Sequence, residues 1–317
     1  MVGWVIQLFS LNLLFDSEFF LRLASVVFMT ADTYIIYRIG KQIRDAQTGL
    51  YAALLYTASI YAFVITGVFI MPDTPLMLFW LLAIWFAIRY FSGLPRSARN
   101  DEDTSLRVIA RRNDEAIQKT NLLLFGLFAG LAMLSKYSGV FLWVGMGLYI
   151  LIFNRKQLRN PYLYLAMLIS AVCCLPILYW NLQNDFISFN FHSGRVSGGT
   201  LNPATFGTEL AGEFLYNNPV LFCLSIIAVV AAFKRKLKME SFALRLVLCI
   251  ALPMILAFWG ISLTRPTLPH WNSPAYVLLI LPAACWLRDR NLDEKGSFKL
   301  PKSIIASLCV MLFVVVA

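Results

Sequence analysis

The sequence predicts an all-α, polytopic integral membrane protein with about ten transmembrane helices. Hydrophobic residues make up 59% of the 317 residues and charged residues only 14%, and the mean hydropathy is +0.70. A water-soluble protein of this size would leave too much apolar surface uncovered. Long apolar stretches also recur along the chain, and short basic or polar segments separate them.

These stretches approach the length of about 20 helical residues that a hydrocarbon core of about 30 Å requires. The fourth and fifth are short, so a single long hydrophobic hairpin is the alternative for that pair. The stretches lie at 19–40, 48–70, 75–93, 121–136, 140–154, 161–180, 216–234, 241–262, 271–287 and 303–317.

Basic residues give the orientation, because Lys and Arg beside membrane helices are retained in the cytoplasm. If 19–40 runs inward and the helices alternate, nearly all of the 27 Lys and Arg residues become cytoplasmic. Dropping one helix would move a basic segment outside, which favours the count of ten. The net charge of +10 then indicates attraction to anionic membrane lipid, and no nucleic-acid partner is expected. The cytoplasmic segments are 38–44, 89–119, 155–159, 234–245 and 288–302.

Two domains are expected. Residues 1–18 form an external interfacial helix, because 4–15 carry no charge, and 19–317 form the transmembrane domain. A cytoplasmic polar insertion lies at about 95–119 and a long external loop at about 181–215. No preceding helix carries 1–18 outward and 303–317 stops within an apolar run, so we expect a longer parent protein.

The six cysteines lie in predicted helices without Cys-x-x-Cys spacing. We therefore expect packing roles for them, no disulfide, no metal site and no cofactor.

Four cations fall on the external face: Arg22, Lys136, Arg195 and Arg265. Ionisable groups at a membrane boundary are costly unless they are paired or solvated, so they indicate a site. They suit a bilayer-anchored lipid phosphate or diphosphate. The alternative is pairing with carboxylates, as for Arg22, which follows Glu18 at i,i+4 spacing. Lys136 has no acidic residue within 15 positions, which favours the ligand for it.

Other external residues allow two interpretations each. Asp73, between Pro72 and Pro75, is either a helix cap or an acid, base or acceptor for a substrate. His270 and Trp271 are either structural and anchoring residues or a polar and aromatic platform for a sugar.

Three runs together carry a resemblance: 71–80 (MPDTPLMLFW), 130–139 (GLAMLSKYSG) and 269–276 (PHWNSPAY). In order and external placement they resemble the bacterial branch of the dolichyl-phosphate-mannose protein mannosyltransferase family, which includes the lipid A aminoarabinose transferases and is often called glycosyltransferase family 39.

The resemblance implies a GT-C-like fold and a hexosyltransferase-like enzyme of the bacterial inner membrane, with its active face external or periplasmic. It would transfer a sugar from a polyprenyl-phosphate donor to a lipid, glycan or protein acceptor. Asp73 matches the acidic residue of the family's second external loop and is the catalytic candidate. Lys136 matches a lysine that the family associates with the donor phosphate. His270 and Trp271 match the family's external His-Trp motif. Arg195 and Arg265 are phosphate candidates on topology alone.

One departure from the family concerns the principal catalytic carboxylate, which members place in the first external loop, before a His-Pro-Pro-Met-like run followed by Gly-Trp. This chain opens at Met1-Val2-Gly3-Trp4, so we expect it to lack that base and to bind a lipid phosphate weakly. The competing class is a transporter or lipid flippase, for which Asp32, well inside 19–40, is the best argument.

Overall fold

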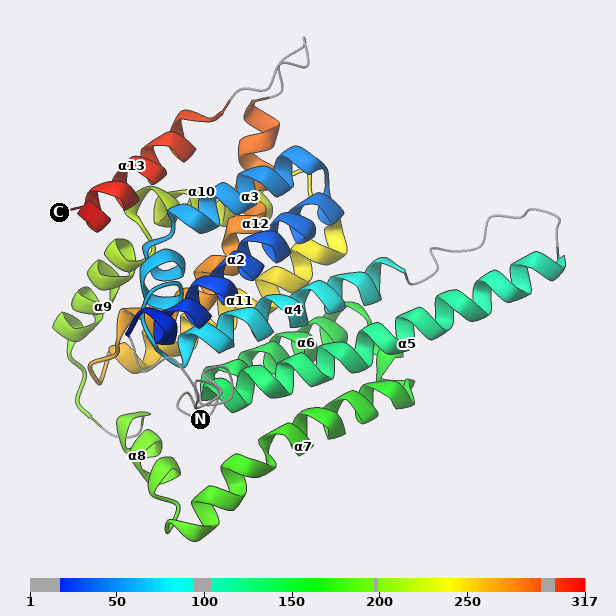
Figure 1. Cartoon of the computed structure of the whole chain (residues 1–317), viewed down its shortest axis with the longest axis horizontal. Coiled ribbons are helices and arrows are strands. Elements are labelled where there is room, and N and C mark those ends of the chain that lie inside the picture. Colours follow the sequence, from blue (N-terminus) through cyan, green and yellow to red (C-terminus); the bar gives the residue numbers. More distant parts are fainter. Residues whose placement is uncertain (1–17, 94–103, 197–198, 292–299, 317) are drawn as a thin grey trace.

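The computed structural model describes residues 18–93, 104–196, 199–291 and 300–316, with side chains for all except 18–21, 104–113 and 195–196. Over these ranges the chain is all-α, as predicted (Figure 1). The interfacial helix expected over 1–18 falls almost wholly outside them. The first helices are α2 (Glu18–Ile43), α3 (Ala46–Ala58), a π-helical turn (Tyr61–Thr66), α4 (Asp73–Ser92), α5 (Thr104–Ser135) and α6 (Phe141–Phe153). The later helices are α7 (Pro161–Gln183), α8 (Ile187–Val196), α9 (Pro203–Tyr216), α10 (Pro219–Phe233), α11 (Ser241–Ser262), α12 (Ser273–Arg290) and α13 (Lys302–Val316).

Every predicted apolar stretch coincides with a helix, and the multi-pass prediction is confirmed. By length and apolar composition alone, four described segments can cross a membrane: α4, Asp114–Ser135 of α5, α7 and α11. A fifth would be α9 with α10, which are bent by 104° at their junction. Other helices fall short because α3 and α10 have only 13 and 15 residues, and because α2 and α12 carry several charged residues.

The helix α12 lies at the centre of the bundle. All residues of 273–285 are buried, and α12 packs against α3, α10 and α11. A helix that is apolar on all sides is stable only when other helices surround it. The run 269–276 therefore leads directly into the most buried helix of the chain.

Close packing of α5 and α7 fixes the position at which α5 ends. A Cβ at Gly126 would lie 2.8 Å from the Ala166 carbonyl carbon, and one at Gly130 would lie 2.7 Å from Ser170 Cα. Small residues four positions apart let two membrane helices approach this closely. The opposite side of α5 packs against α4, so Lys136, directly after α5, is held on a rigid pair of helices.

The other end of the bundle is tied together by ion pairs. Arg44, between α2 and α3, donates to Asp289 at 2.7 Å, and Arg288 donates to Asp45 at 3.1 Å. Asp45 also caps α3 by accepting from the Thr48 backbone N–H at 2.7 Å. These contacts join the α2–α3 corner to the last turn of α12.

Two predicted loops are largely helical. The polar insertion at about 95–119 is helical from Thr104 and continues into α5, which extends past the neighbouring helices (Figure 1). The external loop at about 181–215 contains α8 and α9. Because α9 is bent by 104° from α10, the two do not form one straight span, and the external position of α9 stays a prediction. Hydropathy missed these helices because it detects contact with lipid rather than helical backbone.

Candidate active site

Asp73 begins α4 and is the centre of the candidate site. Its side chain is only 1% exposed, and its Oδ1 accepts from the Tyr61 hydroxyl at 2.8 Å. Tyr61 belongs to the π-helical turn that precedes α4. The capping interpretation of Asp73 is wrong, because Pro72 occupies the N-cap position and no side chain caps the helix. Its carboxylate is instead directed at other side chains.

Lys136 pairs directly with Asp73. Its backbone is extended (φ −156°, ψ 138°) between α5 and a 3-10 turn at Tyr137–Val140. From this break, Nζ donates to Asp73 Oδ1 at 2.8 Å and to Oδ2 at 3.0 Å. The alternative of pairing with a carboxylate, which the sequence disfavoured for Lys136, is therefore present, because the partner lies 63 positions away in the chain. The lysine side chain as a whole is 18% exposed, whereas that of Asp73 is almost fully buried.

His270 lies within the electrostatic influence of this pair. It occupies a 3-10 turn, Pro269–Trp271, directly before α12. Burial lowers the pKa of His270, the positive charge of Lys136 lowers it further, and Asp73 opposes the change. The imidazole is therefore neutral near pH 7 and can both donate and accept a hydrogen bond. Three of the predicted site residues, Asp73, Lys136 and His270, thus come together.

Aromatic rings flank the histidine. The Tyr216 ring, at the end of α9, lies 6.3 Å from that of His270, and the Phe258 ring of α11 lies 6.0 Å from that of Trp271. Trp271 thus belongs to the aromatic lining of this region, and the interpretation as a platform for a sugar remains a prediction.

The 3-10 turn Pro269–Trp271, which we call the His-Trp turn, is fixed in place by Glu213 of α9. The sequence did not single out Glu213 as a site residue. Its buried carboxylate accepts from Trp259 Nε1 at 2.9 Å, Asn272 Nδ2 at 2.6 Å and the Tyr276 hydroxyl at 2.8 Å. Burial raises the pKa of Glu213, and the three donors oppose the rise. One carboxylate therefore fixes α11, the end of the turn and the start of α12.

A glycine lets α9 approach the same turn. A Cβ at Gly212 would lie 2.9 Å from Pro269 Cβ, with the ring Cγ still closer. No larger residue fits there unless the His-Trp turn moves.

Glu209, one turn before Glu213, is buried without a hydrogen-bond partner for either carboxylate oxygen among the described residues. Burial raises the pKa of Glu209 to about 7, the nearby Thr267 hydroxyl opposes the rise, and the charge of Glu213 adds to it.

The remaining cationic candidates are less closely connected to this group. Arg265 follows α11, where its backbone N–H donates to the Ile261 carbonyl at 2.9 Å, and its Nε lies near Gly199. The Arg195 side chain is outside those that the structure describes. Neither is brought to Asp73 by a described contact.

Tyr61 was missed by sequence reasoning, because a buried tyrosine in an apolar run carries no signal of its own. Glu209 and Glu213 were visible as carboxylates of the external segment, without anything to indicate their partners.

Comparison with known proteins supports the resemblance. The sequence profile described as dolichyl-phosphate-mannose-protein mannosyltransferase matches residues 1–93 and 113–180. These ranges include Asp73 and Lys136 and exclude His270.

A curated relative is the lipid A galacturonosyltransferase RgtD of Rhizobium johnstonii (strain DSM 114642 / LMG 32736 / 3841). It is 25% identical over 167 residues, which cover 52% of this chain and 34% of the relative.

Two solved structures, both of ArnT from Cupriavidus metallidurans, share the fold. The structure bound to undecaprenyl phosphate has a TM-score of 0.69 at 18% sequence identity. The alignment covers 100% of this chain and 53% of the ArnT chain. The apo structure has a TM-score of 0.63 at 17% sequence identity, and the alignment covers 99% of this chain and 52% of the ArnT chain. The chain thus spans about a third of the length of RgtD and about half of that of ArnT.

The GT-C-like prediction agrees with this likeness, and the profile match extends over half of the sequence. The chain belongs to the dolichyl-phosphate-mannose-protein mannosyltransferase family.

Proposed function

We propose that this chain forms the membrane core of a glycosyltransferase, which moves a sugar from a polyprenyl-phosphate donor to an acceptor at the external leaflet. The observation that carries the proposal is the ion pair of Asp73 with Lys136, whose side chain is 18% exposed, beside a neutral His270. Family membership supports the class of reaction. The undecaprenyl phosphate named for the ArnT structure supports the class of donor.

Lys136 is proposed to hold the donor phosphate. A phosphate oxygen that reaches Nζ competes with Asp73 for the same ammonium protons. Asp73 Oδ2 accepts only from Lys136 among the described hydrogen bonds, whereas Oδ1 also accepts from Tyr61. Donor binding would therefore release Oδ2 while Tyr61 keeps the carboxylate in place.

The released oxygen can then serve as a base, a role separate from that of the carboxylate which the family places in its first external loop. Asp73 Oδ2 takes the proton of an acceptor hydroxyl as that hydroxyl oxygen bonds to the anomeric carbon of the sugar. The bond between the anomeric carbon and the phosphate oxygen breaks, and the phosphate leaves with the electron pair. The charge that develops on it is stabilised by Lys136. A neutral His270 can donate to the phosphate or to a sugar hydroxyl, with the Trp271 ring beside it, and Arg195 and Arg265 remain further phosphate candidates.

A lipid is the favoured acceptor, since the curated relative is named for lipid A. Glycan and protein acceptors are the alternatives. The proposed location is the bacterial inner membrane, with about ten spans and the site on the external or periplasmic side. That orientation places the run from Arg44 to Asp45 and the end of α12 in the cytoplasm.

Binding of undecaprenyl phosphate to the purified chain in nanodiscs tests the proposal, with a titration that extends to high lipid content. Lys136→Ala should weaken binding about tenfold or more, since it removes a charge-assisted contact. Lys136→Arg should retain part of the affinity. The matched control is Lys119→Ala, in α5 and nearer the other membrane boundary, where Lys119 pairs with the exposed Glu115. Equal affinity of wild type and Lys136→Ala would refute the role of Lys136.

The same protein can be tested as a transporter or flippase. Asp32, the residue that favoured this class, is fully buried and accepts from the Tyr56 hydroxyl of α3 at 3.1 Å. This bond to a neighbouring helix gives Asp32 a structural role. The assay measures movement of a fluorescent polyprenyl phosphate across the bilayer of liposomes. Transport would be favoured if Asp32→Asn abolished this movement and if Lys136→Ala left donor binding unchanged.

A further inference from the structure

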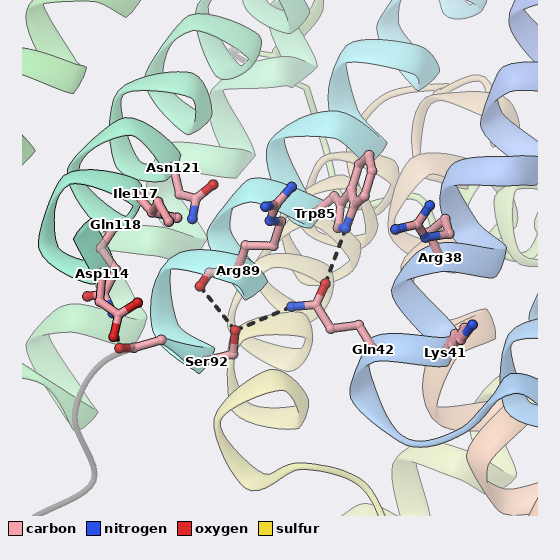
Figure 2. Close-up of a pocket in the computed structure, with 11 residues that line it drawn as sticks. Arg38, Lys41, Gln42, Trp85, Arg89, Ser92, Asp114, Ile117, Gln118 and Asn121 are labelled. Carbon is pink, nitrogen blue, oxygen red and sulfur yellow. Dashed lines mark hydrogen bonds between the residues drawn. The ribbon is translucent and has the colours of Figure 1, made fainter. Parts of the chain in front are cut away.

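A polar pocket lies at the opposite end of α4 from Asp73. It has a volume of about 600 Å³ and is bounded by α2, the last turns of α4 and the middle of α5 (Figure 2). Arg89, which lines it, follows Asp73 by 16 residues, which corresponds to about 24 Å along a helix. The pocket is therefore at the other membrane boundary and is separate from the candidate active site.

The pocket carries excess positive charge. Arg38, Lys41 and Arg89 line it and are exposed, against the single carboxylate of Asp114. Among the side chains that the structure describes, none of these three cations forms an ion pair. Their charge is thus available to an anion.

The two arginines are held in place by the same indole ring. Arg38 Cζ lies 5.5 Å and Arg89 Cζ lies 5.7 Å from the centre of the Trp85 ring. Arg38 also donates to the Tyr34 hydroxyl at 2.7 Å. Stacking lowers the entropy that each guanidinium would lose on binding a ligand.

Hydrogen bonds join two walls of the pocket. Gln42 of α2 accepts from Trp85 Nε1 at 3.2 Å and donates to Ser92 Oγ at 3.3 Å, as the dashed lines in Figure 2 show. The pocket is therefore formed before any ligand arrives.

An apolar stripe on α2 leads to this pocket. Val26, Val27 and Tyr34 are exposed, the last at 55%, and 26, 30, 34 and 38 follow the i,i+4 spacing of one helix face. The exposed Thr30 interrupts this stripe, but its hydroxyl donates to the Val26 carbonyl at 2.8 Å. Lipid is the expected neighbour of such a stripe in a membrane helix. An acyl chain along it would place its headgroup beside Arg38, which favours a lipid over a free anion.

We propose that this pocket binds the phosphate headgroup of an anionic phospholipid in the leaflet opposite the active site. The lipid would bridge α2, α4 and α5 and fix the depth of α4 in the bilayer. The proposal is independent of the transfer reaction, so its failure leaves the proposed function untouched.

The test measures lipid retention by the purified chain. Protein is exchanged into an equimolar mixture of phosphatidylglycerol and phosphatidylcholine, and retained lipids are counted by native mass spectrometry. Wild type should retain more phosphatidylglycerol than phosphatidylcholine. In R38Q/R89Q the ratio of retained phosphatidylglycerol to phosphatidylcholine should fall roughly fivefold for each arginine removed. Lys41→Gln, which removes no described packing contact, should lower the same lipid preference about fivefold.

Arg245→Gln is the matched control, because Arg245 is also an exposed arginine stacked on an aromatic ring, with Cζ 4.8 Å from the Phe153 centroid, but outside the pocket. An unchanged preference in R38Q/R89Q and Lys41→Gln, or an equal loss in Arg245→Gln, would overturn the proposal. So would displacement of the lipid by millimolar inorganic phosphate, which would indicate a site for a free anion.

Discussion

The buried carboxyl group of Glu209 predicts that this protein loses stability as pH rises. Burial raises its pKa from 4.5 to about 7. A group with a raised pKa in the folded state contributes stability that is complete below its unfolded pKa and is lost as pH rises through the folded pKa. At about 1.4 kcal/mol per pKa unit, ionisation of Glu209 costs the folded state about 3 kcal/mol. The loss should occur between pH 4.5 and 7 and be complete above about pH 8.

Glu209→Gln removes the titrating group and keeps the shape of the side chain. Thermal unfolding in detergent should show a wild-type Tm that falls by several degrees between pH 5 and 8.5, whereas the variant should change much less and exceed wild type at pH 8.5. Glu115→Gln, at a carboxylate that is 71% exposed, controls for general effects of charge removal and should follow wild type. A Glu209→Gln variant with the full wild-type pH dependence would refute the assignment of the effect to this carboxyl.

Two further predictions concern the candidate site. Lys136→Met should destabilise the protein by up to about 3 kcal/mol, because it leaves Asp73 buried without a cation. Adding Asp73→Asn should recover much of this loss. The measurement is Tm in detergent, and a double variant no more stable than the single one would contradict the prediction. Gly212→Ala should displace the turn that contains Pro269 and reduce undecaprenyl phosphate binding severalfold, at a stability cost of about 1–3 kcal/mol. Gly207→Ala on the same helix, where a Cβ meets nothing within 4 Å, should bind like wild type, and the argument fails if both glycine variants behave alike.

The helical architecture was largely predictable because membrane helices are selected for long apolar runs, and each run has become a helix. The exceptions have physical causes. The stretch 48–70 is divided into α3 and a π-helical turn, and such a change in backbone hydrogen bonding leaves no trace in hydropathy. The N-terminal half of α5 is polar, so a search for lipid-facing residues interpreted it as an insertion.

The candidate site was predictable in its members but not in its pairings. The predicted topology placed Asp73, Lys136 and His270 at one face, and the structure brings these three residues together. The contact of Asp73 with Lys136 depends on how α4 and α5 pack, and a search of neighbouring positions cannot detect it. Tyr61 and Glu213 were hidden for the same reason, because their importance arises only from the partners that the fold supplies.

The three hydrogen bonds to Glu213 also constrain how the chain is assembled in the membrane. All of its donors, Trp259, Asn272 and Tyr276, follow it in the sequence, so they leave the ribosome later. A buried carboxylate without donors is strongly unfavourable. The helix α9 can therefore take its final position only after α11 and α12 have inserted, and the His-Trp turn is completed at the same stage.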